Sequence, residues 1–194
     1  MNIIIIGGNG FVGRNIQEIL SAAPDINMVT SVSRENEFNL LEEKQNSEHE
    51  RILRQADYII NCAAFTKVNN CEIKKNKAIK INSIGPKNLS LAAKYLDIPI
   101  IHFSSDYVFN GYLKRPYNEK DIPDPINFYG FSKACSELLS RYFEQHLSIV
   151  GPEFDEGLLG KRQIVNQDQR FIPLAFGFDS LEHFIMVGDH VGCY

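Results

Sequence analysis

Short apolar runs alternate with amphipathic stretches along the first 150 residues. Residues 2–6 form a β-branched run that is too short for a helix and is typical of a strand buried on both faces of a parallel sheet. Glycines follow, and apolar residues then recur at helical spacing between Phe11 and Leu20. This pattern predicts a strand, a tight turn and a helix, which together are the first half of a βαβ unit.

The alternation continues to residue 150. It predicts further strands over 28–33, 38–40, 56–64, 98–103 and 147–150. We expect a helix that ends at 51–55, a long helix over 72–96 with a bend at Gly85-Pro86, and a helix over 129–146. Strands that alternate with helices over such a span predict an α/β fold, here a Rossmann-like doubly wound parallel sheet.

The sequence predicts two parts of unequal size. Residues 1–150 are expected to be an NAD(P)-binding Rossmann-like domain that also carries the catalytic residues. Residues 151–194 are too few to build a core of their own, so we expect a short C-terminal appendage on the substrate side.

Composition narrows the class of protein. The 194 residues are 44% hydrophobic and 23% charged, which are ordinary globular values. A net charge of −4 argues against sequence-independent binding of nucleic acid. The four cysteines form no C-x-x-C motif and the five histidines no H-E-x-x-H motif, so we expect reduced thiols and no metal site. The apolar N-terminus is short and lacks a basic leader, so neither a signal peptide nor a membrane span is expected, and the protein is predicted to be cytoplasmic.

The glycines after the first strand can be read in two registers, as Gly8-x-Gly10-x-x-Gly13 or as Gly7-x-x-Gly10-x-x-Gly13. Both suit a tight turn, and glycines have no side chain to keep a pyrophosphate away from the backbone. The helix N-terminus would then attract the pyrophosphate. A plain tight turn is the alternative. The residues expected to contact the dinucleotide here are Gly7, Gly10, Phe11, Val12 and Gly13.

The end of the second strand bears on the choice of cofactor. It lies about 20 residues past the last glycine, where a carboxylate would bind the ribose 2′-hydroxyl of NAD. Ser33 and Arg34 stand there instead, and a hydroxyl beside a guanidinium suits a 2′-phosphate. NADP(H) is therefore preferred; NAD(H) stays open, with Glu35 or Glu37 on the ribose. Further cofactor contacts are expected from Asn39 and Leu40 under the adenine and from Cys62, Ala63 and Ala64 beside the backbone.

Tyr129 and Lys133 are the candidate reactive pair. They are four residues apart at the start of a predicted helix, so both leave the same face. A phenol has a pKa near 10, and we expect the lysine ammonium to lower it. With Ser105 at the carboxyl end of the fifth predicted strand, Tyr129 would protonate a carbonyl oxygen, Ser105 would hydrogen-bond it, and Lys133 would tune Tyr129 and bind the nicotinamide ribose.

Two alternatives stay open for these residues. A Y-x-x-x-K pair is also common on a solvated helix face, and Asn82 would either extend a proton relay through water or simply face solvent or its own backbone. The residues expected to touch a substrate are Thr66, Val68, Ser105, Asp106 and Tyr107.

Several of these segments together resemble the extended short-chain dehydrogenase/reductases, and within them the dTDP-4-dehydrorhamnose reductase group. The matching segments are 7–13, 60–66, 102–111 with its Ser105-Asp106-Tyr107 core, 116–119 and 129–133. The resemblance implies reduction of the 4-keto group of a dTDP-linked 6-deoxyhexose to give dTDP-L-rhamnose for cell-surface polysaccharide. It also implies a C-terminal substrate domain.

The resemblance weakens after residue 150. Residues 151–154 depart from the family's pattern, and residues 160–173 look like a later family segment reached too early, so 151–194 is interpreted as a truncated substrate-binding remnant. Two other functions stay open: a non-catalytic dinucleotide-binding regulatory protein, and a nucleotide-sugar epimerase or dehydratase. The Ser105, Tyr129 and Lys133 set favours an enzyme, with a nucleotide sugar as partner and a homodimer left open.

Overall fold

The computed structural model describes residues 1–32, 39–41, 47–118, 120–143, 147–150 and 164–166. Ser33 and Arg34, the two residues predicted to choose between cofactors, lie outside this part, as does most of the predicted appendage over 151–194. The expectation that the appendage is a truncated remnant therefore stays a prediction.

Within the described residues, six strands form one sheet in the order β2-β1-β3-β4-β5-β6. The first five are parallel and β6 pairs antiparallel with β5. The strands are β1 (Asn2–Ile6), β2 (Met28–Val32), β3 (Tyr58–Asn61), β4 (Ile100–Phe103), β5 (Leu147–Val150) and β6 (Ile164–Asn166).

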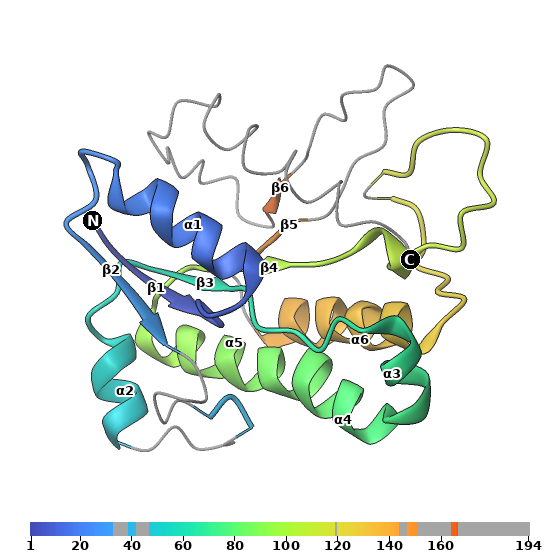
Figure 1. Cartoon of the computed structure of the whole chain (residues 1–194), viewed down its shortest axis with the longest axis horizontal. Helices are drawn as coiled ribbons and strands as arrows, with labels where there is room; N and C mark the ends of the chain where they lie inside the picture. Colours follow the sequence, from blue (N-terminus) through green and yellow to red (C-terminus); the bar gives the residue numbers. More distant parts are fainter. Residues whose placement is uncertain (33–38, 42–46, 119, 144–146, 151–163, 167–194) are drawn as a thin grey trace.

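Helices cover both faces of the sheet, as Figure 1 shows, with α1 on one face and α2, α5 and α6 on the other. The helices are α1 (Phe11–Ser21), α2 (Ser47–Leu53), α3 (Val68–Ile73), α4 (Lys75–Ile79), a π-helical turn η2 (Lys80–Ile84), α5 (Gly85–Leu96), a 3-10 turn η3 (Asp106–Val108) and α6 (Phe128–Phe143). This is the predicted Rossmann-like doubly wound α/β fold, which the structure confirms. No helix of the described part is long and apolar enough to span a membrane.

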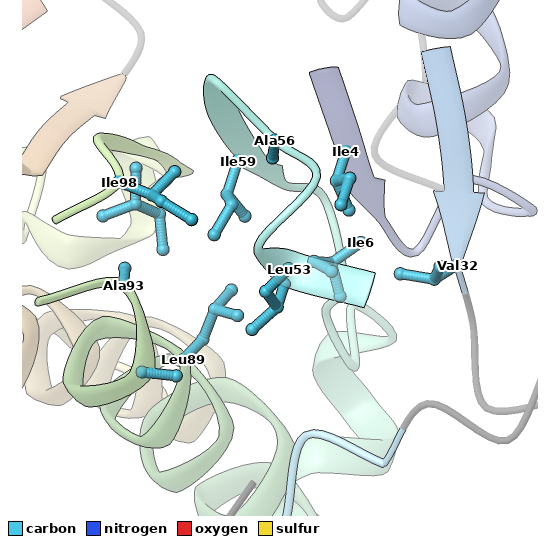
Figure 2. Close-up of a cluster of buried hydrophobic side chains, with 11 residues drawn as sticks. Ile4, Ile6, Val32, Leu53, Ala56, Ile59, Leu89, Ala93 and Ile98 are labelled. Atoms are coloured by element: carbon cyan, nitrogen blue, oxygen red, sulfur yellow. The ribbon is translucent and has the colours of Figure 1, made fainter. Parts of the chain in front are cut away.

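The core forms in two layers because β1 alternates its side chains between the two faces. Ile3 and Ile5 pack with the α1 side chains Ile16 and Leu20. The other cluster, drawn in Figure 2, joins Ile4 and Ile6 to apolar residues of α2, β3 and α5. The members of that cluster are Ile4, Ile6, Val32, Leu53, Ala56, Ile59, Leu89, Ala92, Ala93, Ile98 and Ile100. A strand that is apolar on both faces is what the unbroken run at 2–6 predicted.

The carboxyl ends of β1, β3 and β4 lie side by side at one edge of the sheet. The chain leaves β1 for β2 on one side and then crosses to β3 on the other, so β1 and β3 flank the point at which the winding reverses. Open parallel sheets bind ligands at this edge, beside such a switch point. The predicted cofactor and catalytic residues follow these strand ends.

Asn39 and Leu40 are not in a strand, so the strand predicted over 38–40 is wrong for these two residues; Phe38 lies outside the described part. Leu40 is half-buried against the core, and its carbonyl accepts a hydrogen bond from Asn88 Nδ2 of α5 at 3.2 Å. The Leu41 amide donates to the Asn39 side chain at 3.2 Å. Side-chain bonds of this kind hold the segment as a turn.

The long helix predicted over 72–96 is divided in the structure. Lys74 has φ −112° and ψ 51°, which ends α3 and starts α4. The α4 helix then passes through η2 into α5, with the Gly85 amide donating to the Lys80 carbonyl five residues back. Pro86 has no N–H and stands in the first turn of α5, so the backbone widens into a π turn just before it, where a bend was expected.

Candidate active site

The glycine turn between β1 and α1 is closely packed. Gly7 has φ +79°, and a Cβ built on it would lie 2.7 Å from the Ala63 amide nitrogen, at the end of β3. A Cβ on Gly13 would lie 2.5 Å from the Gly7 carbonyl oxygen. Only glycine fits at these two positions, so the turn and the helix that follows are drawn tightly against the sheet.

The N-terminus of α1 opens onto this turn. Gly10 is its N-cap and supplies no side-chain cap, and the first helical turn holds no acidic residue. Phe11 is 49% exposed and Val12 is half-buried. Helix N–H groups without a side-chain cap, at the end of a parallel strand, suit the oxygens of a phosphate.

The ends of β3 and the neighbouring segments place the other predicted cofactor residues. Cys62 and Ala63 are half-buried and Ala64 is exposed. Burial raises the pKa of the Cys62 thiol to about 12, against an opposing effect of Lys133, so this thiol stays protonated. Cys62, Cys71 and Cys135, the described cysteines, are all free thiols.

Ser105 lies just past β4 and forms the N-cap of the turn η3. Its Oγ accepts a hydrogen bond from the Tyr107 amide at 3.2 Å and donates to Asp106 Oδ1 at 3.0 Å. These bonds fix the serine side chain at the carboxyl edge of the sheet.

Tyr129 stands in the first turn of α6, which is capped twice. The Gly130 amide donates to Asn127 Oδ1 at 2.8 Å, and the Phe128 amide donates to Glu72 Oε1 of α3 at 2.6 Å. The helix start also lies hard against η3, because a Cβ on Gly130 would be 1.9 Å from the Tyr107 carbonyl oxygen. Because the start of α6 lies against η3, Tyr129 stands next to Ser105.

The Tyr129 phenol makes two contacts with the η3 segment. Its hydroxyl interacts with the Ser105 side chain, and its ring meets the Tyr107 ring edge-on with centroids 5.7 Å apart. Burial raises the pKa of Tyr129 above 10.0, the Ser105 side chain acts in the opposite direction, and Asp106 adds to the increase. The expectation that Lys133 lowers this pKa is wrong for the chain alone, because desolvation of the half-buried phenol outweighs the effects that favour a phenolate.

Lys133 is buried, with 2% of its surface exposed, so the alternative of a solvated helix face is also wrong. Its Nζ donates to the Phe103 carbonyl at the end of β4 at 2.5 Å and lies 3.3 Å from His102 Nε2. Burial lowers the pKa of Lys133 to about 8, although Glu137 and Cys62 act to raise it. An ammonium that is this easily deprotonated is unusual and is a feature of functional sites.

Three buried polar residues next to Lys133 were not among the predicted site residues. Asn61 ends β3, His102 lies in β4 and Ser136 lies on α6, each no more than 1% exposed. His102 hydrogen-bonds both of the others. A histidine inside an otherwise apolar strand was the one sequence signal that could have indicated this cluster.

Asn82 lies in the π turn and is fully buried, so it does not face solvent. Its Oδ1 accepts from the Phe65 amide at 2.6 Å, while its Nδ2 donates to the Phe65 carbonyl at 3.0 Å and to Ser132 Oγ at 2.9 Å. This side chain joins the segment after β3 to α6, one residue before Lys133.

The predicted substrate residues divide into two groups. Asp106 and Tyr107 line a cavity of about 500 Å³, together with Phe109, Asn110, Gly111, Leu113, Lys114, Arg115, Pro116, Tyr117 and Ile126. Thr66 is exposed just before α3, and Val68 is half-buried at its start. Most of the cavity wall comes from residues 106–117, and an Arg115–Asp121 ion pair of 2.6 Å and a Phe109–Tyr117 ring stack of 4.2 Å hold this segment in shape.

A doubly wound sheet with a glycine turn at its switch point defines a Rossmann-like α/β domain, here with a serine, a tyrosine and a buried lysine at the same edge. Residues 1–150 match the model of the RmlD substrate binding domain, so the chain belongs to this family.

Relatives of known name agree with this family. The dTDP-4-dehydrorhamnose reductase of Sinorhizobium fredii is 30% identical over 195 residues, which is 100% of this chain and 61% of that protein. The crystal structure of a dTDP-4-dehydrorhamnose reductase from Clostridium acetobutylicum has a TM-score of 0.68 at 34% identity, over 78% of this chain and 52% of that one. The enzyme of the same name from Bacillus anthracis, solved in complex with NADP, has a TM-score of 0.69 at 30% identity, over 77% and 52%. The chain spans about half the length of the curated relatives it matches.

Proposed function

We propose that this chain is an NAD(P)H-dependent reductase of the 4-keto group of a nucleotide-linked deoxysugar, converting dTDP-4-dehydrorhamnose to dTDP-L-rhamnose. The observation that carries the proposal is that Tyr129 lies beside Ser105 and the η3 turn, at the edge of the sheet that also holds the glycine turn. A proton donor and a carbonyl-binding hydroxyl beside a dinucleotide site suit ketone reduction.

The residues around the glycine turn fit a nicotinamide dinucleotide. Gly7 and Gly13 hold the turn close to the sheet, and the N-terminus of α1 behind Gly10 offers amide donors to a pyrophosphate. Cys62, Ala63 and Ala64 would lie along the cofactor, Tyr129 and Lys133 beside its ribose, and Asn39 and Leu40 near the adenine. When bound, the reduced nicotinamide supplies the hydride for the sugar carbonyl.

Tyr129 would deliver the proton. Its raised pKa keeps the phenol protonated at neutral pH, which suits a group that must donate a proton to the carbonyl oxygen. Ser105 would hydrogen-bond the same oxygen as negative charge develops on it. The buried Lys133 side chain would donate a hydrogen bond to the nicotinamide ribose.

The sugar nucleotide would approach from the side of η3. Asp106 and Tyr107 belong both to the wall of the cavity and to the turn that holds Ser105, which supports a substrate role for them. Thr66 and Val68 stay predictions as substrate contacts, and a homodimer and a cytoplasmic location stay predictions for the protein as a whole.

The preference for NADP(H) is a finer proposal that rests on Ser33 and Arg34. A guanidinium binds a 2′-phosphate through paired charged hydrogen bonds, which NADH cannot offer. Arg34→Ala should therefore weaken NADPH binding about tenfold or more and leave NADH binding almost unchanged, as measured by fluorescence titration of each cofactor. Equal losses for both cofactors would remove Arg34 from this role.

The proposed activity is tested by incubating the chain with NADPH and dTDP-4-dehydrorhamnose while following the absorbance of the reduced nicotinamide. We expect oxidation of NADPH that depends on the sugar nucleotide. Tight NADPH binding without oxidation would contradict the proposal and favour a regulatory dinucleotide-binding protein. Conversion of the sugar without net loss of NADPH would favour an epimerase or dehydratase.

A further inference from the structure

A chain of hydrogen bonds crosses three elements directly beneath Lys133. The Ala63 amide donates to Asn61 Oδ1 at 3.1 Å, and Asn61 Nδ2 lies 3.0 Å from His102 Nδ1. His102 Nε2 in turn lies 2.7 Å from Ser136 Oγ. The three side chains are buried, so water does not compete for these bonds.

The backbone N–H of Ala63 fixes which atoms donate and which accept along this series of hydrogen bonds. The Ala63 N–H can only donate, so the atom of Asn61 that faces it must be the carbonyl oxygen. The amide nitrogen of Asn61 then faces His102 and can only donate, which makes Nδ1 an acceptor. A neutral imidazole with Nδ1 as acceptor carries its hydrogen on Nε2.

The Nε2 hydrogen therefore points to the side on which Ser136 and Lys133 lie. Ser136 Oγ is the acceptor at 2.7 Å, while Lys133 Nζ is 3.3 Å away. An ammonium at that position has only N–H bonds to present to another N–H, whereas an uncharged amine has a lone pair that can accept. The other ionisable groups that act on Lys133 are Glu137, one turn along α6, and Cys62, at the end of β3.

We propose that Asn61, His102 and Ser136 are positioning residues for Lys133: they hold His102 as the neutral Nε2–H tautomer, whose N–H favours the uncharged amine of the lysine. The inference deepens the proposed function, since that function gives Lys133 its role at the ribose. Burial and the nearby lysine lower the pKa of His102 strongly, which agrees with a neutral imidazole.

The tautomer can be observed directly in the full chain. Long-range proton–nitrogen NMR spectra of protein with nitrogen-15 in its histidines distinguish the two neutral tautomers and the imidazolium, and His102→Gln assigns the signal. We expect His102 to remain the neutral Nε2–H form across the neutral pH range. An imidazolium or the Nδ1–H tautomer would overturn the proposal, and the measurement needs neither NADPH nor a sugar.

Two substitutions should move the titration of Lys133 in opposite directions. In Asn61→Asp, a carboxylate accepts from both the Ala63 N–H and an Nδ1–H, so Nε2 becomes an acceptor for the ammonium. The midpoint of Lys133 should rise by about one pH unit or more. In Ser136→Ala, the Nε2–H loses its acceptor and has only the lysine lone pair to bond, so the midpoint should fall.

Ser140→Ala is the matched control. Ser140 lies one helical turn beyond Ser136 on α6 and is equally buried, and its Oγ has no hydrogen-bond partner among the described residues. The midpoint, followed by NMR of the lysine Cε signal that Lys133→Met removes, should not change in this variant. Shifts of the same sign in Asn61→Asp and Ser136→Ala would contradict the proposal, because a role in packing alone has no direction.

Measurements of turnover distinguish a failure of this inference from a failure of the proposed function. If the chain reduces the sugar nucleotide, the pH dependence of turnover should shift with the Lys133 midpoint in both variants, and a pH profile that stayed fixed would remove the link to catalysis. If the chain shows no reduction but the NMR results hold, the proposed function fails and the positioning of Lys133 stands.

Discussion

Tyr129 is a phenol whose pKa the fold raises above its ordinary value. Its half-buried position causes the increase, and Tyr107 packs edge-on against its ring. A phenol with an ordinary pKa is already protonated at neutral pH, so Tyr129 carries a proton to donate before any cofactor binds.

Tyr129→Phe tests this assignment with the smallest available change. Loss of a positioned general acid typically costs about 10²–10⁴-fold in rate, so turnover should fall by this amount. Cofactor affinity should be nearly unchanged, because the ring and its packing remain. Turnover and NADPH affinity are measured on the same preparation, and normal turnover by the variant would show that another group donates the proton.

Lys133 makes stability depend on pH in a direction that can be worked out. Its folded-state pKa of about 8 lies below the ordinary 10.5, so between these values the unfolded chain binds more protons than the folded chain. The contribution of Lys133 to the free energy of unfolding should therefore rise as pH rises through this window. Below the folded pKa the buried ammonium is a cost to the fold.

Lys133→Met isolates this contribution. The difference in the free energy of unfolding between the native chain and the variant, measured by urea denaturation at several pH values, should increase from about pH 8 upward in favour of the native chain. A difference that is constant over this window would contradict the lowered pKa.

Element by element, the reactive residues are placed by contacts between segment ends. The start of α6 is held by Asn127, by Glu72 of α3 and by the close approach of Gly130 to the η3 turn. The π turn adds a second support, since Asn82 and Ser83 both bond Ser132 of α6. Tyr129 and Lys133 are thus fixed by elements that are distant in sequence.

Gly130→Ala should disturb this arrangement. Its Cβ would meet the Tyr107 carbonyl oxygen at 1.9 Å, so α6 and η3 must separate. Overpacking of this kind costs about 1–3 kcal/mol, and turnover should fall further than cofactor affinity because the Tyr129–Ser105 pair moves apart. Leu138→Ala, at a position 68% exposed on the same helix, is the control and should change neither thermal stability nor turnover greatly. Equal activity in the two variants would contradict the positioning role of the contact.

The sequence predicted the elements whose signals are local. The β-branched run of β1, the glycines and the apolar spacing of α1 are adjacent in the chain, so their pattern was sufficient. The turn at Asn39 and Leu40 was misjudged as a strand, because its shape depends on Asn88, 48 residues away from Leu40. The spacing of the apolar residues does not indicate that the long helix is divided at Lys74.

In the candidate site, too, the sequence pattern predicted some features, while others depend on contacts between residues that are distant in the sequence. That Ser105, Tyr129 and Lys133 reach one edge of the sheet follows from strand order, which the sequence pattern predicts. The raised pKa of Tyr129 and the partners of Lys133 do not follow from it, because they depend on burial and on His102 in a different element. Desolvation depends on how the fold packs, and a sequence motif does not indicate it.

As a whole molecule, the described chain is one sheet with a complete core and a reactive edge. The strands β1 to β4 contribute apolar side chains to the clusters on both faces, and β6 extends the sheet antiparallel beyond β5. The chain covers roughly half of each relative, and we propose that this half binds the dinucleotide and reduces the sugar by itself.

Transfer of deuterium from labelled cofactor tests that claim most directly. The chain is incubated with NADPH that carries deuterium at the transferable position of the nicotinamide and with dTDP-4-dehydrorhamnose, and the sugar nucleotide is then analysed by mass spectrometry and NMR. We expect a product with one deuterium on the carbon of the former 4-keto group, and loss of this product in Tyr129→Phe. Binding of NADPH with no deuterium in the sugar would contradict the proposal.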